Sequence, residues 1–119
     1  MQFSILIPTL NNLDYLKLCL NSLKKNSVYD HEILVHSNNS SDGTSDFLKL
    51  HNIKEIKTKD NFGLCTALNQ LASHASNDYF LFLHDDMYIC PNWDQILIDE
   101  INQYDHNNFY LSGVMIEKT

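Results

Sequence analysis

The sequence predicts an α/β fold, a three-layer α/β/α sandwich built on a mainly parallel sheet. Apolar runs of strand length alternate along the chain with segments whose apolar residues recur at helical spacing, in the order βαβαβαβαβ. With 119 residues, 44% of them hydrophobic and 19% charged, the chain has the composition of a globular protein and the length of one domain. We therefore expect residues 1–119 to form a single domain.

Five segments have the character of strands. The first, "FSILIP", is rich in branched residues and ends at a proline, and "EILVHS" and the less buried "IKEIKT" follow it. "YFLFL" is continuously apolar, which is typical of a strand covered on both faces. "FYLSGVMI" completes the set. The predicted strands are residues 3–8, 32–37, 53–58, 79–83 and 109–116.

Four segments between these strands have helical periodicity. Leucines spaced three and four apart predict an amphipathic helix over residues 12–25. The polar turn "NNSSDGT" precedes a short helix that carries Phe47 and Leu48, and apolar residues at helical spacing predict a further helix over residues 64–75. Pro91 opens the last helix, which runs to Ile101. Each helix would connect two strands by a crossover.

Polar loops follow four of the predicted strands. They are residues 8–12, 37–42, 60–63 and 84–86. Because the carboxyl ends of parallel strands meet at one edge of a sheet, where such folds bind their ligands, we expect these loops to converge on one site.

The acidic pair Asp85 and Asp86 follows the apolar run "YFLFL" and lies in the last of these loops. Two adjacent carboxylates at the end of a strand can hold a divalent cation such as Mn²⁺ or Mg²⁺, which in turn binds phosphate oxygens. The alternative is structural, since aspartate is also a favoured turn residue. The position in an α/β chain favours the metal site.

Other features of the sequence exclude several classes of protein. The net charge of −7 with scattered acids argues against nucleic-acid binding through a basic surface. No apolar segment is long enough to cross a bilayer, and the three cysteines, odd in number and without metal-binding spacing, favour a reducing, cytoplasmic location. Neither a dinucleotide fingerprint nor a P-loop is present. A signalling receiver domain has similar alternation, but its acidic pair should follow the first strand.

Four segments together resemble glycosyltransferase family 2, a group of inverting enzymes with the Rossmann-like GT-A fold. They are "SILIPTLNNLDYLKLCLNSL", "EILVHSNNSSDGT", "NFGLCTALNQL" and "YFLFLHDDMYICP", in family order across nearly the whole chain. The resemblance implies the nucleotide-sugar-binding half of a transferase. Its donor would be a nucleoside-diphosphate sugar, commonly a uridine one, its acceptor a carbohydrate or glycan hydroxyl, and its cofactor a divalent metal.

The resemblance also implies site residues by position. Pro8, Thr9 and Leu10 would lie at the nucleoside, Ser37 and Asn38 at the base, and Asn61 and Gly63 beside the base or ribose. Asn11 would also belong to the nucleotide-sugar site. Asp85 and Asp86 would form a DxD-like metal and diphosphate site, with Asp86 the main ligand. Two positions depart from the family pattern, because Ser37 stands where an acid is usual and His84 where the first acid of DxD often lies.

The resemblance does not supply a general base or an acceptor-binding half within these residues. We therefore expect either a part of a longer transferase, truncated before the acceptor-binding half, or a catalytically silent nucleotide-binding or interaction module of the same fold. In either case an apolar surface that is normally covered would favour self-association into a homo-oligomer.

Overall fold

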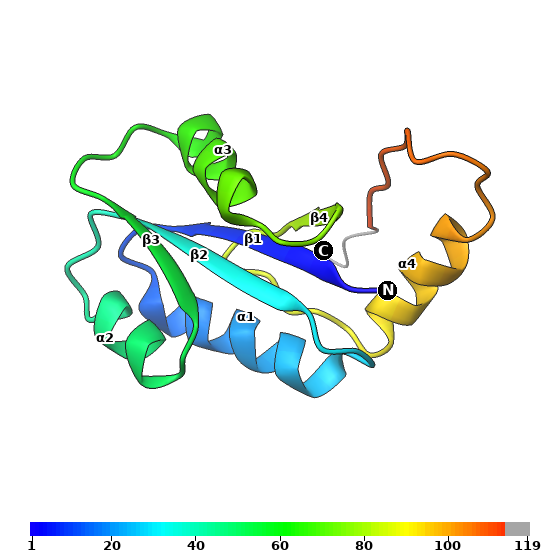
Figure 1. Cartoon of the computed structure of the whole chain (residues 1–119). Coiled ribbons are helices and arrows are strands. Elements are labelled where there is room, and N and C mark those ends of the chain that lie inside the picture. Colours follow the sequence, from blue (N-terminus) through cyan, green and yellow to red (C-terminus); the bar gives the residue numbers. More distant parts are fainter. Residues whose placement is uncertain (114–119) are drawn as a thin grey trace, which may run out of the picture.

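The computed structural model describes residues 1–113, along which strands and helices alternate (Figure 1). The strands are β1 (Phe3–Thr9), β2 (Glu32–Asn38), β3 (Lys54–Thr58) and β4 (Tyr79–Phe82). The helices are α1 (Leu13–Asn26), α2 (Thr44–Leu50), α3 (Leu64–His74) and α4 (Trp93–Ile101). Each of these elements lies close to its predicted bounds.

The four strands form one parallel sheet in the order β3-β2-β1-β4. In the register of the central pair, Thr9 at the end of β1 lies opposite Ser37 of β2. On the other side of β1, Leu6 pairs with Phe82, the last residue of β4. The carboxyl ends of β2, β1 and β4 therefore lie side by side, as the prediction of a parallel sheet required.

Helices cover both faces of the sheet, which confirms the three-layer α/β/α prediction. α1, α2 and α4 lie on one face of the sheet and α3 lies on the other (Figure 1). On the first face the helices pack on inward side chains of β1 and β2, and on the second Leu71 of α3 packs on Leu6 and Leu34. The first and larger core contains Phe3, Ile5, Ile7, Leu16, Cys19, Leu20, Leu23, Val35, Leu48, Leu83, Ile98 and Ile101. Within residues 1–113 no helix has the length and apolar character that a bilayer span requires.

The expectation that residues 79–83 are covered on both faces is wrong. Phe80 is 52% exposed and Phe82 is 41% exposed, while their neighbours Tyr79 and Leu81 pack against the larger core. The reason is the place of β4 at the edge of the sheet: α3 lies over β1 and β2. The aromatic side chains on the α3 face of β4 are therefore left exposed.

The fifth predicted strand is also absent from the part of the chain that the structure describes. Residues 109–113 are not in a strand, and the remainder of the predicted segment lies outside the described residues. Phe109 instead stacks on Tyr79, with ring centroids 5.8 Å apart, and on Tyr104, with centroids 5.3 Å apart. Phe109, one of the aromatic residues that predicted a strand, thus packs as a side chain on other aromatic rings without being in a strand.

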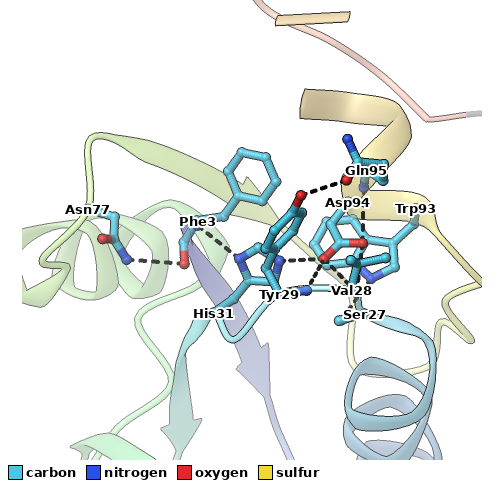
Figure 2. A network of polar contacts seen from close by, with 9 residues as sticks. All are labelled: Phe3, Ser27, Val28, Tyr29, His31, Asn77, Trp93, Asp94 and Gln95. Carbon is cyan, nitrogen blue, oxygen red and sulfur yellow. Dashed lines mark hydrogen bonds and ion pairs between the residues drawn. The ribbon is translucent and has the colours of Figure 1, made fainter. Parts of the chain in front are cut away.

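The amino-terminal end of the sheet is joined to α4 by a buried polar network (Figure 2). The Asp94 carboxylate accepts hydrogen bonds from the backbone N–H groups of Val28, Tyr29 and Gln95 at 2.9–3.0 Å. It also pairs with Nε2 of His31 at 2.9 Å, and His31 Nδ1 accepts the Phe3 N–H at 3.0 Å. One carboxylate thus connects α4, the α1–β2 loop and, through His31, the start of β1.

These hydrogen bonds determine the acidity of Asp94. Burial of the carboxyl would by itself raise its pKa, but the N–H groups of Tyr29 and Val28 and the His31 side chain outweigh burial and lower the pKa below its ordinary value. Asp94 is therefore an ionised structural residue at neutral pH. Trp93 packs against Phe3 in the same region and donates a hydrogen bond from Nε1 to Ser27.

Candidate functional site

A cavity of about 300 Å³ lies at the carboxyl ends of the strands. Residues at or after the carboxyl ends of all four strands contribute to its wall, so these strand ends converge on one cavity as predicted. The lining residues are Pro8, Thr9, Leu10, Asn12, Asn38, Asn61, Gly63, Leu64, His84 and Asp85.

Thr9 joins the end of β1 to the acidic loop. Its buried hydroxyl donates a 2.8 Å hydrogen bond to Oδ2 of Asp85. Because β1 and β4 are adjacent strands, this bond holds the Asp85 carboxylate at the wall of the cavity while its other oxygen has no partner within residues 1–113. A carboxylate held in this way is preorganised to act on a ligand.

Asn38, the last residue of β2, carries the clearest sign of a missing partner. Its side chain lines the cavity and is only 7% exposed, yet its Oδ1 accepts no hydrogen bond from residues 1–113. A buried carbonyl oxygen without a donor costs about 1–3 kcal/mol, so such atoms are uncommon in folded proteins. A hydrogen-bond donor on a ligand in this cavity would satisfy Asn38.

Ser37 does not line the cavity, although the sequence placed it there. Its hydroxyl donates to Oε1 of Glu55 on β3 at 2.7 Å, and Ser45 of α2 donates to the same oxygen at 2.6 Å. Successive strand residues point to opposite faces, so Ser37 faces α2 while Asn38 faces the α3 side. Asn38 is thus the member of this pair that lines the cavity, and a role of Ser37 at the base of the donor stays a prediction.

Asn11 also lies away from the cavity lining, and its neighbour Asn12 takes that place. Asn11 adopts the left-handed backbone conformation with φ 46° and accepts the Ser41 N–H on Oδ1 at 2.7 Å, while its own N–H donates to Ser40. Its role is to join the loops after β1 and β2. Asn12 and Leu64 were not among the predicted site residues, although both lie within the segments that predicted the site.

The remaining predicted residues lie where α3 begins. Asn61 accepts the Gly63 N–H on Oδ1 at 3.0 Å, and Gly63 has φ 89°, a value that favours glycine. This conformation turns the chain into α3 and places Asn61, Gly63 and Leu64 on one side of the cavity.

The acidic loop presents its two carboxylates differently. Asp85 lines the cavity, whereas Asp86 is exposed and lies outside the lining, and the ring of His84 packs edge-on against Phe82 with centroids 4.7 Å apart. Among residues 1–113 no three His, Cys, Asp or Glu side chains are grouped to hold a metal. Two carboxylates nevertheless fit Mg²⁺ or Mn²⁺, because such ions are commonly held by one or two carboxylates together with substrate phosphates.

Charge in and below the cavity is predominantly negative. The chain contains no arginine, and no lysine is among the cavity-lining residues of the described chain. Beneath the acidic loop, burial together with the negative charges of Asp85 and Asp86 raises the pKa of the Cys19 thiol to about 12, with burial the largest cause. Cys19 is therefore a protonated thiol at neutral pH, not a nucleophile.

The architecture and this cavity define an α/β protein with its ligand site at the carboxyl ends of a parallel sheet. The family model for glycosyl transferase family 2 matches residues 4–118. An uncharacterized glycosyltransferase of Rickettsia conorii is 32% identical over 114 residues, which cover 92% of this chain and 19% of that protein. A chondroitin synthase of Pasteurella multocida is 30% identical over 101 residues, covering 82% of this chain and 10% of that protein.

Solved structures give the same result. TarS of S. aureus (residues 1–349) superposes with a TM-score of 0.78 and 26% identity over 87% of this chain and 33% of that chain, and a TarS structure with UDP gives 0.77. The chain thus spans about a third or less of each of these relatives. It belongs to glycosyltransferase family 2 and has part of the GT-A fold.

Proposed function

We propose that this chain is the donor-binding part of an inverting glycosyltransferase that uses a nucleoside-diphosphate sugar, with uridine as the nucleoside. The transferred sugar would pass to a hydroxyl of a carbohydrate or glycan acceptor. The observation that carries the proposal is the cavity at the strand ends, where the buried Asn38 Oδ1 lacks a donor and Thr9 holds Asp85 at the wall. Family membership provides the reaction class.

The chemistry of Asn38 is compatible with uracil as the base. Uracil presents an N–H between two carbonyl groups, so an amide side chain can accept from the N–H through Oδ1 and donate to a carbonyl through Nδ2. Guanine also presents a carbonyl group beside an N–H, so Asn38 could pair with either base. The choice of uracil over guanine is supported by the UDP found in one TarS structure.

The absence of cationic side chains from the described cavity lining supports a divalent metal as the partner of the diphosphate. Asp85 and Asp86 would hold Mn²⁺ or Mg²⁺, with Asp86 the main ligand. Such an ion, when bound, neutralises charge on the leaving nucleoside diphosphate. Thr9 keeps one oxygen of Asp85 occupied, so that the other is directed to the ligand.

The three free cysteines accord with a cytoplasmic reaction.

Calorimetric titration with UDP, with and without Mn²⁺, tests the proposal. We expect Mn²⁺-dependent binding by the wild-type chain and its loss in Asp86→Ala. Asp78→Ala is the matched control, because Asp78 is an exposed aspartate at the opposite end of β4. GDP in place of UDP should bind at least tenfold more weakly.

Binding that is independent of Mn²⁺, or equal for the two aspartate variants, would contradict the metal site. Tighter binding of GDP would contradict the uridine assignment. If UDP binds with Mn²⁺ but neither hydrolysis nor transfer of a UDP-sugar exceeds background, the chain acts as the silent nucleotide-binding module.

A further inference from the structure

The inner face of α1 carries polar side chains where a helix core would ordinarily be apolar. Cys19, Ser22 and Asn26 are all buried, and they alternate with the core leucines Leu20 and Leu23. Their spacing of three and four residues puts them in one stripe along the helix. The stripe faces the loop that runs from the end of β4 to the start of α4.

Each polar group of this stripe is used by that loop. Cys19 Sγ contacts the His84 carbonyl oxygen at 3.7 Å, and Ser22 Oγ accepts the Ile89 N–H at 2.9 Å. Asn26 Nδ2 donates to the Ile89 carbonyl at 2.7 Å, and its backbone oxygen accepts the N–H of Asn92 at 3.1 Å. Three consecutive positions on one helix face thus contact the loop from residue 84 to residue 92.

Within α1 itself the stripe makes one side-chain hydrogen bond, which Ser22 Oγ donates to the Cys19 carbonyl at 2.7 Å. Its other side-chain contacts go to the loop. Buried polar side chains cost free energy unless they are hydrogen-bonded, and leucine or alanine would serve the helix better. The loop, in contrast, has backbone groups that no strand or helix satisfies, and buried groups of this kind need partners. The stripe is therefore explained by the loop it holds.

We infer that Cys19, Ser22 and Asn26 are positioning residues for the Asp85–Asp86 pair. The pair lies between the two points at which α1 holds the loop, the His84 carbonyl on one side and Ile89 on the other. Thr9 holds the Asp85 side chain, and α1 holds the backbone that carries both carboxylates. As far as ligand binding is concerned, the inference rests on the proposed function.

Asn26→Asp tests the inference because it keeps the shape of the side chain and replaces the donor to the Ile89 carbonyl by a carboxylate oxygen. The matched control is Asn21→Asp, which makes the same change of charge on the exposed face of the same helix. We expect Asn26→Asp to bind UDP with Mn²⁺ roughly 10- to 100-fold more weakly per folded molecule, as is typical when a residue behind a metal ligand is changed. Asn21→Asp should stay within twofold of the wild type.

A second measurement does not depend on ligand. In two-dimensional NMR spectra of the free protein, Asn26→Asp should shift the backbone amide signals of Asp85 and Asp86 and accelerate hydrogen exchange at Ile89. Asn21→Asp should leave these signals in place. A residue that only stabilises α1 would lower the melting temperature and alter neither the signals of the acidic pair nor the affinity of the folded fraction.

The two proposals fail in different ways. If the wild-type chain binds no UDP with Mn²⁺, the proposed function fails, and the amide signals still decide whether α1 positions the pair. Unchanged Asp85 and Asp86 signals in folded Asn26→Asp overturn the inference, and so does unchanged affinity where the wild type binds. Should Asn26→Asp not fold, Ser22→Ala removes the acceptor of the Ile89 N–H and is judged by the same two measurements.

Discussion

The two ends of the parallel sheet use buried polar groups in opposite ways. At the amino end, the Asp94 carboxylate is surrounded by donors from three backbone N–H groups and His31 (Figure 2). At the carboxyl end, the Asn38 carbonyl oxygen is buried and has no donor within residues 1–113. A buried polar group whose hydrogen-bonding capacity is filled by the protein has a structural role. A buried oxygen without a donor, at the wall of a cavity, points to a role in binding a ligand.

This difference teaches that burial of a polar residue is a poor guide to function unless its partners are counted. Asp94 has the features of a catalytic carboxylate, since it is fully buried, paired with a histidine and shifted in pKa. Yet its hydrogen bonds join α4 to the α1–β2 loop, and it lies at the end of the sheet opposite the cavity. The comparison predicts that changes at the amino end alter stability and that changes at the carboxyl end alter binding.

The largest effect is expected from Asp94→Asn. The amide can no longer accept from all of its present donors, and its NH₂ group would face backbone N–H groups, so we expect a loss of about 3 kcal/mol in the free energy of unfolding. Urea denaturation measures this loss, and the exposed Asp105→Asn should stay within about 0.5 kcal/mol of the wild type. UDP affinity of the folded variant should not change. A variant of wild-type stability, or one that folds but does not bind, would break the comparison.

The same carboxylate should make stability depend on pH. Because the pKa of Asp94 is lower in the folded chain than in the unfolded one, its contribution is complete above the unfolded value of about 3.9 and is lost as the pH falls through the lower folded value. The stability difference between wild type and Asp94→Asn should therefore be full at pH 7 and shrink below about pH 4. Urea titrations across this range measure it. A difference that grows on acidification would show that the sign is wrong.

At the carboxyl end, Asn38→Leu should have the reverse effect. Leucine removes the buried oxygen that lacks a donor, so stability should be unchanged or higher by up to about 1 kcal/mol. Binding of UDP should fall about tenfold or more, because the ligand loses its hydrogen-bond acceptor. Calorimetry and urea denaturation give the two quantities, with the exposed Asn108→Leu as the control. Reduced stability together with wild-type affinity would make Asn38 a structural residue like Asp94.

Local patterns predicted most of the fold because strand and helix periodicities depend on neighbouring residues. They failed where the outcome depended on sheet order. The run "YFLFL" has the pattern of a central strand, and only the position of β4 at the edge leaves Phe80 and Phe82 exposed. Likewise, Ser37 lies on the α2 face of β2 and donates to Glu55 on the neighbouring strand, a contact between residues that no local pattern links.

The candidate site was predictable to the level of loops, not of side chains. Polar residues after each strand identified the edge at which the cavity lies, because parallel strands bring their carboxyl ends together. Which member of the pair Ser37 and Asn38 faces the cavity depends on the strand register, where a shift of one residue exchanges the faces. The polar stripe of α1 was hidden for another reason, since its partners lie more than sixty residues away in the sequence.

The smallest effect on stability is expected from Phe80→Lys. Phe80 lies on β4 at the edge of the sheet, where its side chain is exposed. The edge strand β3 has the exposed lysines Lys54 and Lys57, a common protection against pairing with another chain, whereas β4 exposes Phe80 and Phe82. We therefore expect the wild-type chain to self-associate through β4. Phe80→Lys should reduce this association and change the free energy of unfolding by no more than about 0.5 kcal/mol.

Sedimentation velocity over a range of concentrations measures the association. Tyr110→Lys is the matched control, because it removes an aromatic side chain that is 90% exposed and adds the same charge away from the sheet. If both variants reduce association equally, the added charge rather than the β4 edge is responsible. If the wild type is monomeric and neither variant differs from it, the exposed aromatic residues of β4 do not form a self-association surface. The cavity at the strand ends would then be the only binding surface that we infer for the described residues.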